Sequence, residues 1–161
     1  MSVKKDFLLV VIVGAAVGVL AQPILANLIV SPTLVVRLGF FLGFLVLAPV
    51  ALGVAYLVGR KIPVLYQFAK FGAVGALNSS VDLGLLNVLI YVTGIASGAG
   101  FSFFKALSFL AATTNSFFWN KFWTFGSRGP LRAGETAKFY AVAVVGWVLN
   151  VGVASVVVNG V

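Results

Sequence analysis

Side chains that could perform covalent or acid–base chemistry are scarce in this sequence of 161 residues. Histidine and cysteine are absent, and the only carboxylates are Asp6, Asp82 and Glu135. Without imidazole or thiol groups, histidine acid–base catalysis, thiolate chemistry and the usual zinc sites are excluded. A hydrolase site with two carboxylates would have to join Asp82 to a residue that we expect at a membrane surface. The sequence therefore predicts a protein that is not an enzyme, with no cofactor and no metal.

Asp82 is the most informative of these residues, because it lies near the middle of a long apolar segment. Asn78 lies one helical turn before it on the same face. If the next apolar segment folds back through residues 94–100, Asp82 lies about 18 Å and Asn115 about 21 Å from that turn, at 1.5 Å per residue, so the two side chains can meet. We predict an intramembrane polar site of Asn78, Asp82 and Asn115. It would either hold a polar ligand or hydrogen-bond neighbouring helices. Lys105 is shallower, and we expect it to extend to the outer surface.

Composition identifies the chain as an integral membrane protein. Hydrophobic residues make up 61% of it and charged residues 9%, against about 25% charged residues in an average soluble domain. A helix needs about 20 apolar residues to cross a bilayer. Five segments meet this length, which predicts an all-α bundle of about five transmembrane helices. They are residues 7–30, with a kink at Gln22-Pro23, and residues 33–58, 66–93, 101–123 and 139–158.

The basic residues predict the orientation of these helices, since Lys and Arg gather at cytoplasmic helix ends. With the N-terminus cytoplasmic and the C-terminus outside, nine of the eleven lie on the inner side, leaving Arg37 and Lys105 outside. The net charge of +8 therefore reflects membrane topology, and nucleic acid is not an expected partner. The inner residues are Lys4, Lys5, Arg60, Lys61, Lys70, Lys121, Arg128, Arg132 and Lys138.

Some of the inner cations fall at adjoining helix ends together with an indole and an amide. A cation beside an aromatic ring at headgroup depth suits a lipid phosphate, although it equally suits anionic membrane lipids in general. We predict that this cluster binds a lipid phosphate or headgroup. Its residues are Lys70, Asn120, Lys121, Trp123 and Arg128.

Pairs of glycines four residues apart suggest places where helices approach closely. Gly14 and Gly18 form one such pair, and Gly39 and Gly43 form another. Gly-x-x-x-Gly spacing lets two helix backbones pack tightly. The sequence leaves open whether Gly14 and Gly18 contact another part of the chain or a second copy in a homo-oligomer.

Two motifs resemble the GtrA-like family of small polytopic membrane proteins. They are Phe-Gly-Ala-Val-Gly-Ala-Leu-Asn at residues 71–78 and Asn-Lys-Phe-Trp-Thr-Phe at residues 120–125. Lys138-Phe139, with Gly146 and Asn150, is similar to the family's third helix. The resemblance covers residues 66–158. It divides the chain into a two-helix extension, residues 1–62, and a GtrA-like three-helix region, residues 63–161.

The resemblance implies a role with polyprenyl-phosphate-linked sugars in the synthesis of cell-surface polysaccharide or glycolipid. Family members are proposed to translocate such a lipid as a flippase, or to support the membrane glycosyltransferase that makes it. The implied location is a bacterial inner membrane, with the lipid-linked sugar and membrane lipids as partners. The residues leave an alternative from another class: a small ion- or proton-coupled transporter, most simply oligomeric, with Asp82 as the ion site.

Overall fold

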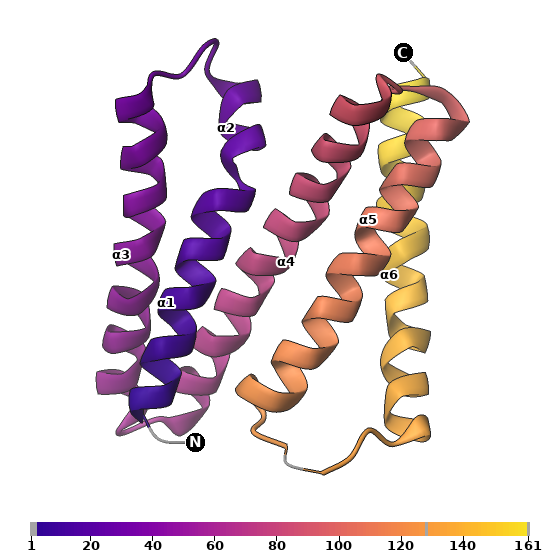
Figure 1. Cartoon of the computed structure of the whole chain (residues 1–161). Helices are drawn as coiled ribbons and strands as arrows, with labels where there is room; N and C mark the ends of the chain where they lie inside the picture. The colour runs from indigo at the N-terminus through magenta and orange to yellow at the C-terminus, as the bar shows by residue number, and fades with distance from the viewer. Residues whose placement is uncertain (1–2, 128, 161) are drawn as a thin grey trace.

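The computed structural model describes residues 3–127 and 129–160, apart from the side chain of residue 27, and every regular element within these residues is helical. The long helices run up and down, with the N-terminal helices on one side, the C-terminal pair on the other and α4 crossing obliquely between them (Figure 1). The elements are α1 (Val3–Leu20), α2 (Gln22–Leu28), α3 (Leu34–Gly59), α4 (Pro63–Thr93), α5 (Gly98–Trp119), the π-helix η1 (Asn120–Thr124) and α6 (Ala133–Asn159).

Four helical segments among the described residues are long and apolar enough to cross a membrane, so the chain is a multi-pass integral membrane protein. They are Val3–Ala26, Leu34–Gly59, Pro63–Thr93 and Ala133–Asn159. The fifth predicted span corresponds to α5 and is not one of the four. Its polar residues, which include Lys105 and Asn115, make it less apolar than the others. It nevertheless runs beside α4 and α6 over much of their height (Figure 1).

The helix boundaries follow from local sequence. The predicted kink at Gln22-Pro23 is confirmed as a break between α1 and α2, where Pro23 occupies the first turn of α2. Proline is favoured there because that position needs no intrahelical N–H donor. The Thr33 side chain caps α3 by accepting a hydrogen bond from the Val36 amide at 3.4 Å. Gly94 ends α4 at φ +72°, a left-handed conformation that glycine adopts without strain.

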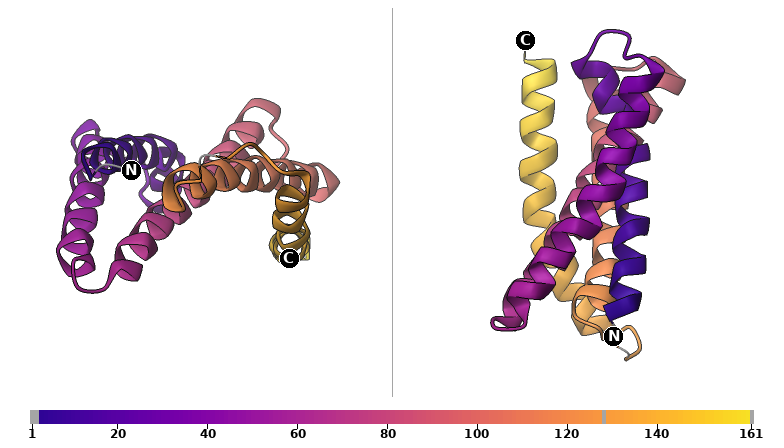
Figure 2. Two further views of the ribbon diagram at one scale, coloured as in Figure 1. Left: turned by 90° about the horizontal axis from the view of Figure 1, so that it is seen from below. Right: turned by 90° about the vertical axis from the view of Figure 1, so that its left-hand side faces the viewer.

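The tightest core of the molecule joins the N-terminal helices to α4. Val10, Val13 and Val17 of α1 pack with Leu52 of α3 and with α4 residues in one buried cluster. The view from below in Figure 2 shows α1 and α3 beside the start of α4. The N-terminal pair therefore packs directly on the rest of the chain. The connection between α3 and α4 includes residue 62, and the division into two regions at that residue stays a prediction.

Gly14 and Gly18 allow α1 to pack closely against α3 of the same chain. A Cβ atom on Gly14 would lie 2.6 Å from the Phe44 carbonyl oxygen of α3, and one on Gly18 would lie 2.9 Å from the Phe41 ring. Side chains at these positions would force the two helices apart. A Cβ atom on Gly39 or Gly43 would meet no heavy atom within 4 Å, so this second pair does not mark a close approach among the described residues.

Unlike α1 and α3, helices α5 and α6 are linked by an ion pair and hydrogen bonds along the length of their hairpin. The Lys121 ammonium bonds to Glu135 at one end, and the hydroxyls of Thr114 and Tyr140 lie 2.9 Å apart further along. At the other end the Asn159 side chain accepts a hydrogen bond from the Gly98 amide at 2.5 Å. None of the described residues of α6 is buried. These polar contacts at three heights, together with the Phe117 ring packed against Phe139 with 5.0 Å between ring centres, align α6 with α5.

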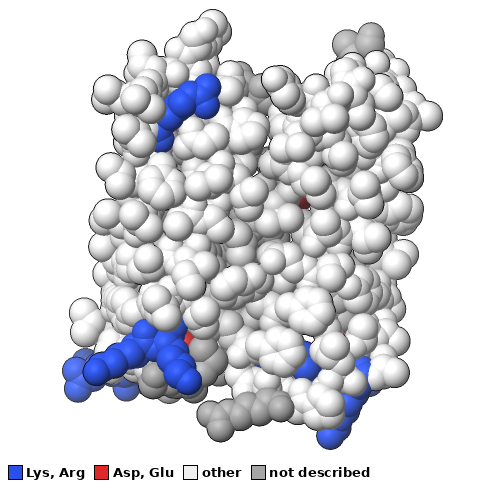
Figure 3. Space-filling model, in the orientation of Figure 1, with Lys and Arg blue, Asp and Glu red and all other residues white. Residues whose placement is uncertain are grey.

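Basic residues gather at one end of the bundle, where α1 begins, α3 ends, α4 begins and α6 begins. Figure 3 shows most of the blue surface at this lower end, with little red surface because two of the carboxylates are buried. The end contains Lys4, Lys5, Arg60, Lys61, Arg132 and Lys138. Arg128 lies outside the described residues. We refer to this as the basic end of the bundle.

The glycine contacts give a matched test of the α1–α3 packing. Gly14→Val should lower stability by about 1–3 kcal/mol, the usual effect of forcing methyl groups into a packed contact. Gly43→Val adds the same side chain to a helix of the same bundle, but where no atom lies nearby. Thermal unfolding of both variants in detergent would measure the difference. Equal midpoints would show that Gly14 is not a packing constraint.

Candidate functional site

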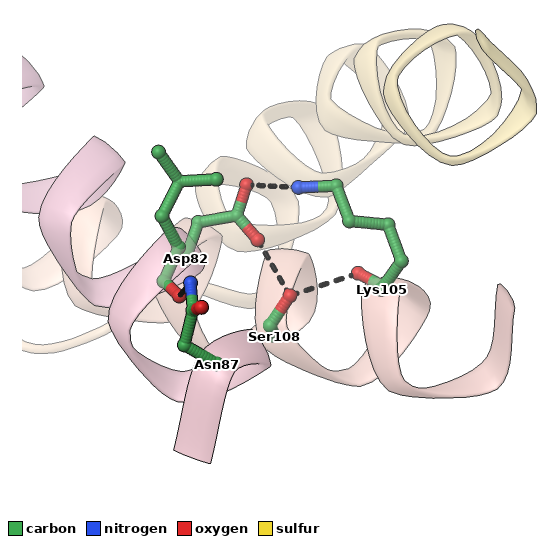
Figure 4. Close-up of polar contacts among 5 residues, drawn as sticks. Asp82, Asn87, Lys105 and Ser108 are labelled. Atoms are coloured by element: carbon green, nitrogen blue, oxygen red, sulfur yellow. Dashed lines mark hydrogen bonds and ion pairs between the residues drawn. The ribbon is translucent and has the colours of Figure 1, made fainter. Parts of the chain in front are cut away.

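The centre of the candidate site is a buried ion pair between α4 and α5. The Lys105 ammonium donates to Asp82 Oδ2 at 2.5 Å, and the Ser108 hydroxyl donates to Asp82 Oδ1 at 2.6 Å (Figure 4). All three are buried, with Asp82 8% and Lys105 4% exposed. An ionised carboxylate in mid-membrane costs at least about 2.5–3.5 kcal/mol when unpaired. Pairing with Lys105 and Ser108 offsets that cost.

Two expectations about this region were wrong. Lys105 turns inward to Asp82 instead of extending to the outer surface, because its long side chain reaches a carboxylate that would otherwise be unpaired. Asn115 meets Asn78 rather than Asp82, and its amide donates to Asn78 Oδ1 at 2.7 Å. The cause is the start of α5, at Gly98 and not at residue 101. Three further residues of helix move Asn115 about 4.5 Å deeper, past Asp82.

A second buried cluster lies at the basic end and centres on Asp6 of α1. Asp6 accepts hydrogen bonds from the Lys70 ammonium at 3.2 Å, the Tyr66 hydroxyl at 3.0 Å and the Trp123 indole N–H at 3.0 Å. Asp6 is 3% exposed and Lys70 6% exposed. The Lys70 ammonium also lies 5.6 Å from the centre of the Trp123 ring. Lys70 is therefore already neutralised and desolvated, and it faces α1.

The π-helix η1 orients the remaining residues of the predicted phosphate cluster. Its widened turn is closed by a hydrogen bond from the Phe125 amide to the Asn120 carbonyl at 2.9 Å. Such a turn carries one extra residue and is frequent at functional sites. Lys121 bonds to Glu135 of α6 at 2.5 Å, whereas Trp123 bonds to Asp6 of α1. Lys121 and Trp123 are two residues apart in a helical segment, so their side chains point to opposite sides of it, one toward α6 and the other toward α1.

The five residues predicted to bind a lipid phosphate consequently do not form one cluster. Lys70 and Trp123 belong to the Asp6 cluster on the α1 side. Asn120 and Lys121 lie on the α6 side, and Arg128 falls outside the described residues. The Lys121 side chain is 3% exposed but its partner Glu135 is 45% exposed, so of these two lysine–carboxylate pairs only this one opens to its surroundings.

Three hollows follow one another along α5 and η1, all between α4 and α6. The Lys121 cavity, about 180 Å³, is lined by Phe71, Phe117, Asn120, Lys121, Phe125, Glu135 and Phe139. The Asp82 cavity, about 260 Å³, is lined by Asn78, Ser79, Asp82, Phe109, Ala112, Thr113, Ser116 and Asn150. The Lys105 groove, about 690 Å³, is lined by Leu83, Leu86, Phe101, Lys105, Gly146, Leu149, Asn150, Val153, Ala154, Val157 and Val158.

Polar side chains connect these hollows. The Asn120 amide donates to the Ser116 hydroxyl at 3.1 Å, which joins the Lys121 cavity to the Asp82 cavity. The Asp82–Lys105 pair joins the Asp82 cavity to the Lys105 groove, and Asn150 lines both. Asn120 Oδ1 is buried without a hydrogen-bond partner among the described residues. The α4–α6 side therefore presents a row of polar groups from the basic end past mid-height.

Several residues of this site were not among the predicted site residues. Asp6 and Glu135 proved to be the partners of Lys70 and Lys121, and Asn150 lines two hollows. One signal was available: the sequence has three carboxylates and eleven cations. In an apolar environment each carboxylate is expected to find a cation. The identity of each partner, however, depends on helix register within one turn.

Comparison with known proteins identifies the family of this chain. The sequence model of the GtrA/DPMS transmembrane domain family matches residues 70–161, which include α5, η1, α6 and most of α4. The chain belongs to this family, as its two motifs predicted. All three hollows are lined by residues of the matched region. No curated protein and no solved structure gives a significant match.

The Asp82–Lys105 pair can be tested by a double-mutant cycle. Lys105→Met leaves a buried carboxylate unpaired and should lower stability by about 3–5 kcal/mol. Adding Asp82→Asn removes that charge and should recover most of the loss. Unfolding in detergent or a mild denaturant would measure the coupling. Additive effects of the two substitutions would contradict a direct buried pair.

Proposed function

We propose that this protein translocates a polyprenyl-phosphate-linked sugar across a bacterial inner membrane for the synthesis of cell-surface polysaccharide or glycolipid. Membership of the GtrA/DPMS transmembrane family, associated with polyprenyl-linked glycosylation, supports the substrate class. In this role the protein is not an enzyme, because it moves the lipid without making or breaking a bond. The excess of cations at one end of the bundle supports a cytoplasmic N-terminus and an external C-terminus.

The observation that carries the proposal is the row of three hollows between α4 and α6. A lipid-linked sugar has a polar head that must avoid hydrocarbon and a long chain that can stay in it. The Asp82 cavity offers amides and hydroxyls to the sugar, chiefly from Asn78, Ser116 and Asn150. The Lys105 groove is mostly apolar and suits part of the chain. The two environments lie side by side, as the two parts of the substrate require.

Lysines at both ends of the row would receive the phosphate. Lys121 and Lys105 are 16 residues apart on nearly continuous helix, or about 24 Å at 1.5 Å per residue. The hydrocarbon core of a bilayer is about 30 Å thick. Glu135 is 45% exposed, so an incoming phosphate can replace it beside Lys121 without a large rearrangement. We therefore assign the first phosphate contact to Lys121, with Asn120 next to it.

The alternative of an ion- or proton-coupled transporter receives less support from the geometry. A cation site needs a carboxylate whose charge is not already compensated. Asp82 is bonded to both Lys105 and Ser108, so a bound metal ion would add a positive charge beside a buried lysine. Support of a membrane glycosyltransferase is the second role that the family resemblance implies. It would appear as co-purification of that enzyme without transport by this chain alone.

Lys121 and Arg37 provide the first test of the proposal. Lys121→Ala should reduce transport of a lipid-linked sugar in proteoliposomes by at least about tenfold, the loss typical of one charge-assisted contact. Arg37→Ala should leave it unchanged, because Arg37 lies at the opposite end of the bundle and, among the described residues, its side chain donates a hydrogen bond to the Pro32 carbonyl. Equal losses in both variants would exclude Lys121 as the phosphate contact.

Asn150 gives a second test, directed at the sugar. Its side chain is exposed, lines two hollows and has no hydrogen-bond partner among the described residues. Asn150→Leu should keep the protein folded but slow transport several-fold, because sugar hydroxyls would lose a partner. Val148→Leu, on the same helix but away from both hollows, serves as the control. Unimpaired transport by Asn150→Leu would show that this side of α6 does not contribute to the transport path.

A further inference from the structure

A separate cavity lies on the opposite side of α5, against α1. It measures about 470 Å³ and is lined by Lys5, Leu9, Phe118, Trp119, Phe122 and Trp123. The translocation path uses Phe117, Asn120 and Lys121 of the same segment, on the face toward α6. This aromatic cavity therefore shares no residue with the three hollows. Lys5 and Leu9 also lie outside the region that matches the family.

The walls of the aromatic cavity are rigid aromatic rings. Trp119 and Trp123 meet edge to face with their centres 5.6 Å apart, and Phe118 and Phe122 stack with their centres 6.2 Å apart. Trp123 is 2% exposed, and its indole N–H is fixed by Asp6. Asp6 is held in turn by Lys70 and Tyr66. The Trp123 wall of the cavity is thus held in place by a hydrogen bond, whereas the Phe118 and Phe122 rings are exposed.

The electrostatics of this cavity favour an anion. Lys5 is the one charged side chain among the described residues that line it, and Lys5 forms no hydrogen bond or ion pair with any of them. Its neighbour Asp6 cannot neutralise it, because Asp6 is buried and bonded to Lys70. Aromatic faces alone would also attract a cation. The Lys5 ammonium disfavours that ligand, and a purely apolar ligand would leave the ammonium unpaired.

The position of the cavity in the bundle indicates which class of anion it binds. Lys5 belongs to the first turn of α1, and Trp119 and Trp123 lie where α5 passes into η1, so the cavity is at the basic end. Lys and Trp are concentrated at the membrane–water interface, where one part of a ligand is apolar and the other hydrated. We propose that the aromatic cavity binds an anionic lipid, with its phosphate at Lys5 and the start of its chain against the aromatic rings.

Adjacent lysines make this proposal directly testable. Lys4 and Lys5 are both exposed, but only Lys5 lines the cavity. Native mass spectrometry of the full chain in neutral detergent would count retained lipid during titration with short-chain phosphatidylglycerol, with phosphatidylcholine as the zwitterionic comparison. We expect Lys5→Gln to lower phosphatidylglycerol retention about fivefold, the factor for one lysine beside an anionic lipid. Lys4→Gln should have little effect.

A second pair of variants tests the aromatic walls. Phe122→Ala should weaken binding, whereas Phe68→Ala, at a more exposed phenylalanine that does not line the cavity, should not. Equal losses in the two lysine variants, equal retention of the two phospholipids, or no effect of Phe122→Ala would overturn the proposal.

Competition with a short polyprenyl monophosphate identifies the source of the lipid phosphate. Equal competition by the two lipids would indicate a site for anionic membrane lipid in general. Strong preference for the polyprenyl lipid would indicate a site for the carrier itself. Transport through the α4–α6 hollows can fail its own tests without affecting either result, because the two regions share no lining residue.

Discussion

The free energy of a carboxylate in an apolar medium is the constraint on which this bundle depends. An unpaired charge there costs several kcal/mol, and removing one partner of a buried pair is strongly destabilising. Each of the three carboxylates is bonded to a lysine of another element: Asp6 of α1 to Lys70 of α4, Asp82 of α4 to Lys105 of α5, and Glu135 of α6 to Lys121 of η1. The two pairs with buried carboxylates connect α1, α4 and α5, and the Glu135–Lys121 pair, whose carboxylate side chain is 45% exposed, links α6 to η1.

This constraint also explains how far the sequence alone could predict the structure. Hydropathy, turn residues and proline gave helices close to those observed, and the two motifs identified the family. The partners of charged residues were harder to predict, because one turn of helix decides which side chains meet. An error of three residues in the start of α5 was enough to pair Asn115 with the wrong residue of α4. The π-turn at Asn120–Thr124 has no clear sequence signal, whereas the spacing of Lys121 and Trp123 already places them on opposite sides of a helix.

The segment from α5 to η1 has two sides that pack differently. Toward α1, Trp123 is part of a dense hydrophobic core and is bonded to Asp6. Toward α6, an ion pair and hydrogen bonds alternate with hollows, the Phe117 ring packs against Phe139, and no described residue of α6 is buried. The proposed translocation would need one helix to move relative to a fixed frame, and α6, which has no buried described residue, is the helix with the fewest buried contacts to lose. In this chain α1 and α3 supply much of that frame.

The two pairs along the proposed path have a further property in common. In both, a lysine is held by a carboxylate that occupies the position an anionic ligand would take. A phosphate that replaces Glu135 at Lys121, or Asp82 at Lys105, leaves the lysine charge compensated at each stage. The displaced groups differ, because Glu135 is 45% exposed and can turn to water, whereas Asp82 is buried and needs a new partner. The amides and hydroxyls around Asp82 are the groups available for that purpose. If the proposed function holds, the barrier to translocation lies at the Asp82–Lys105 pair rather than at the basic end.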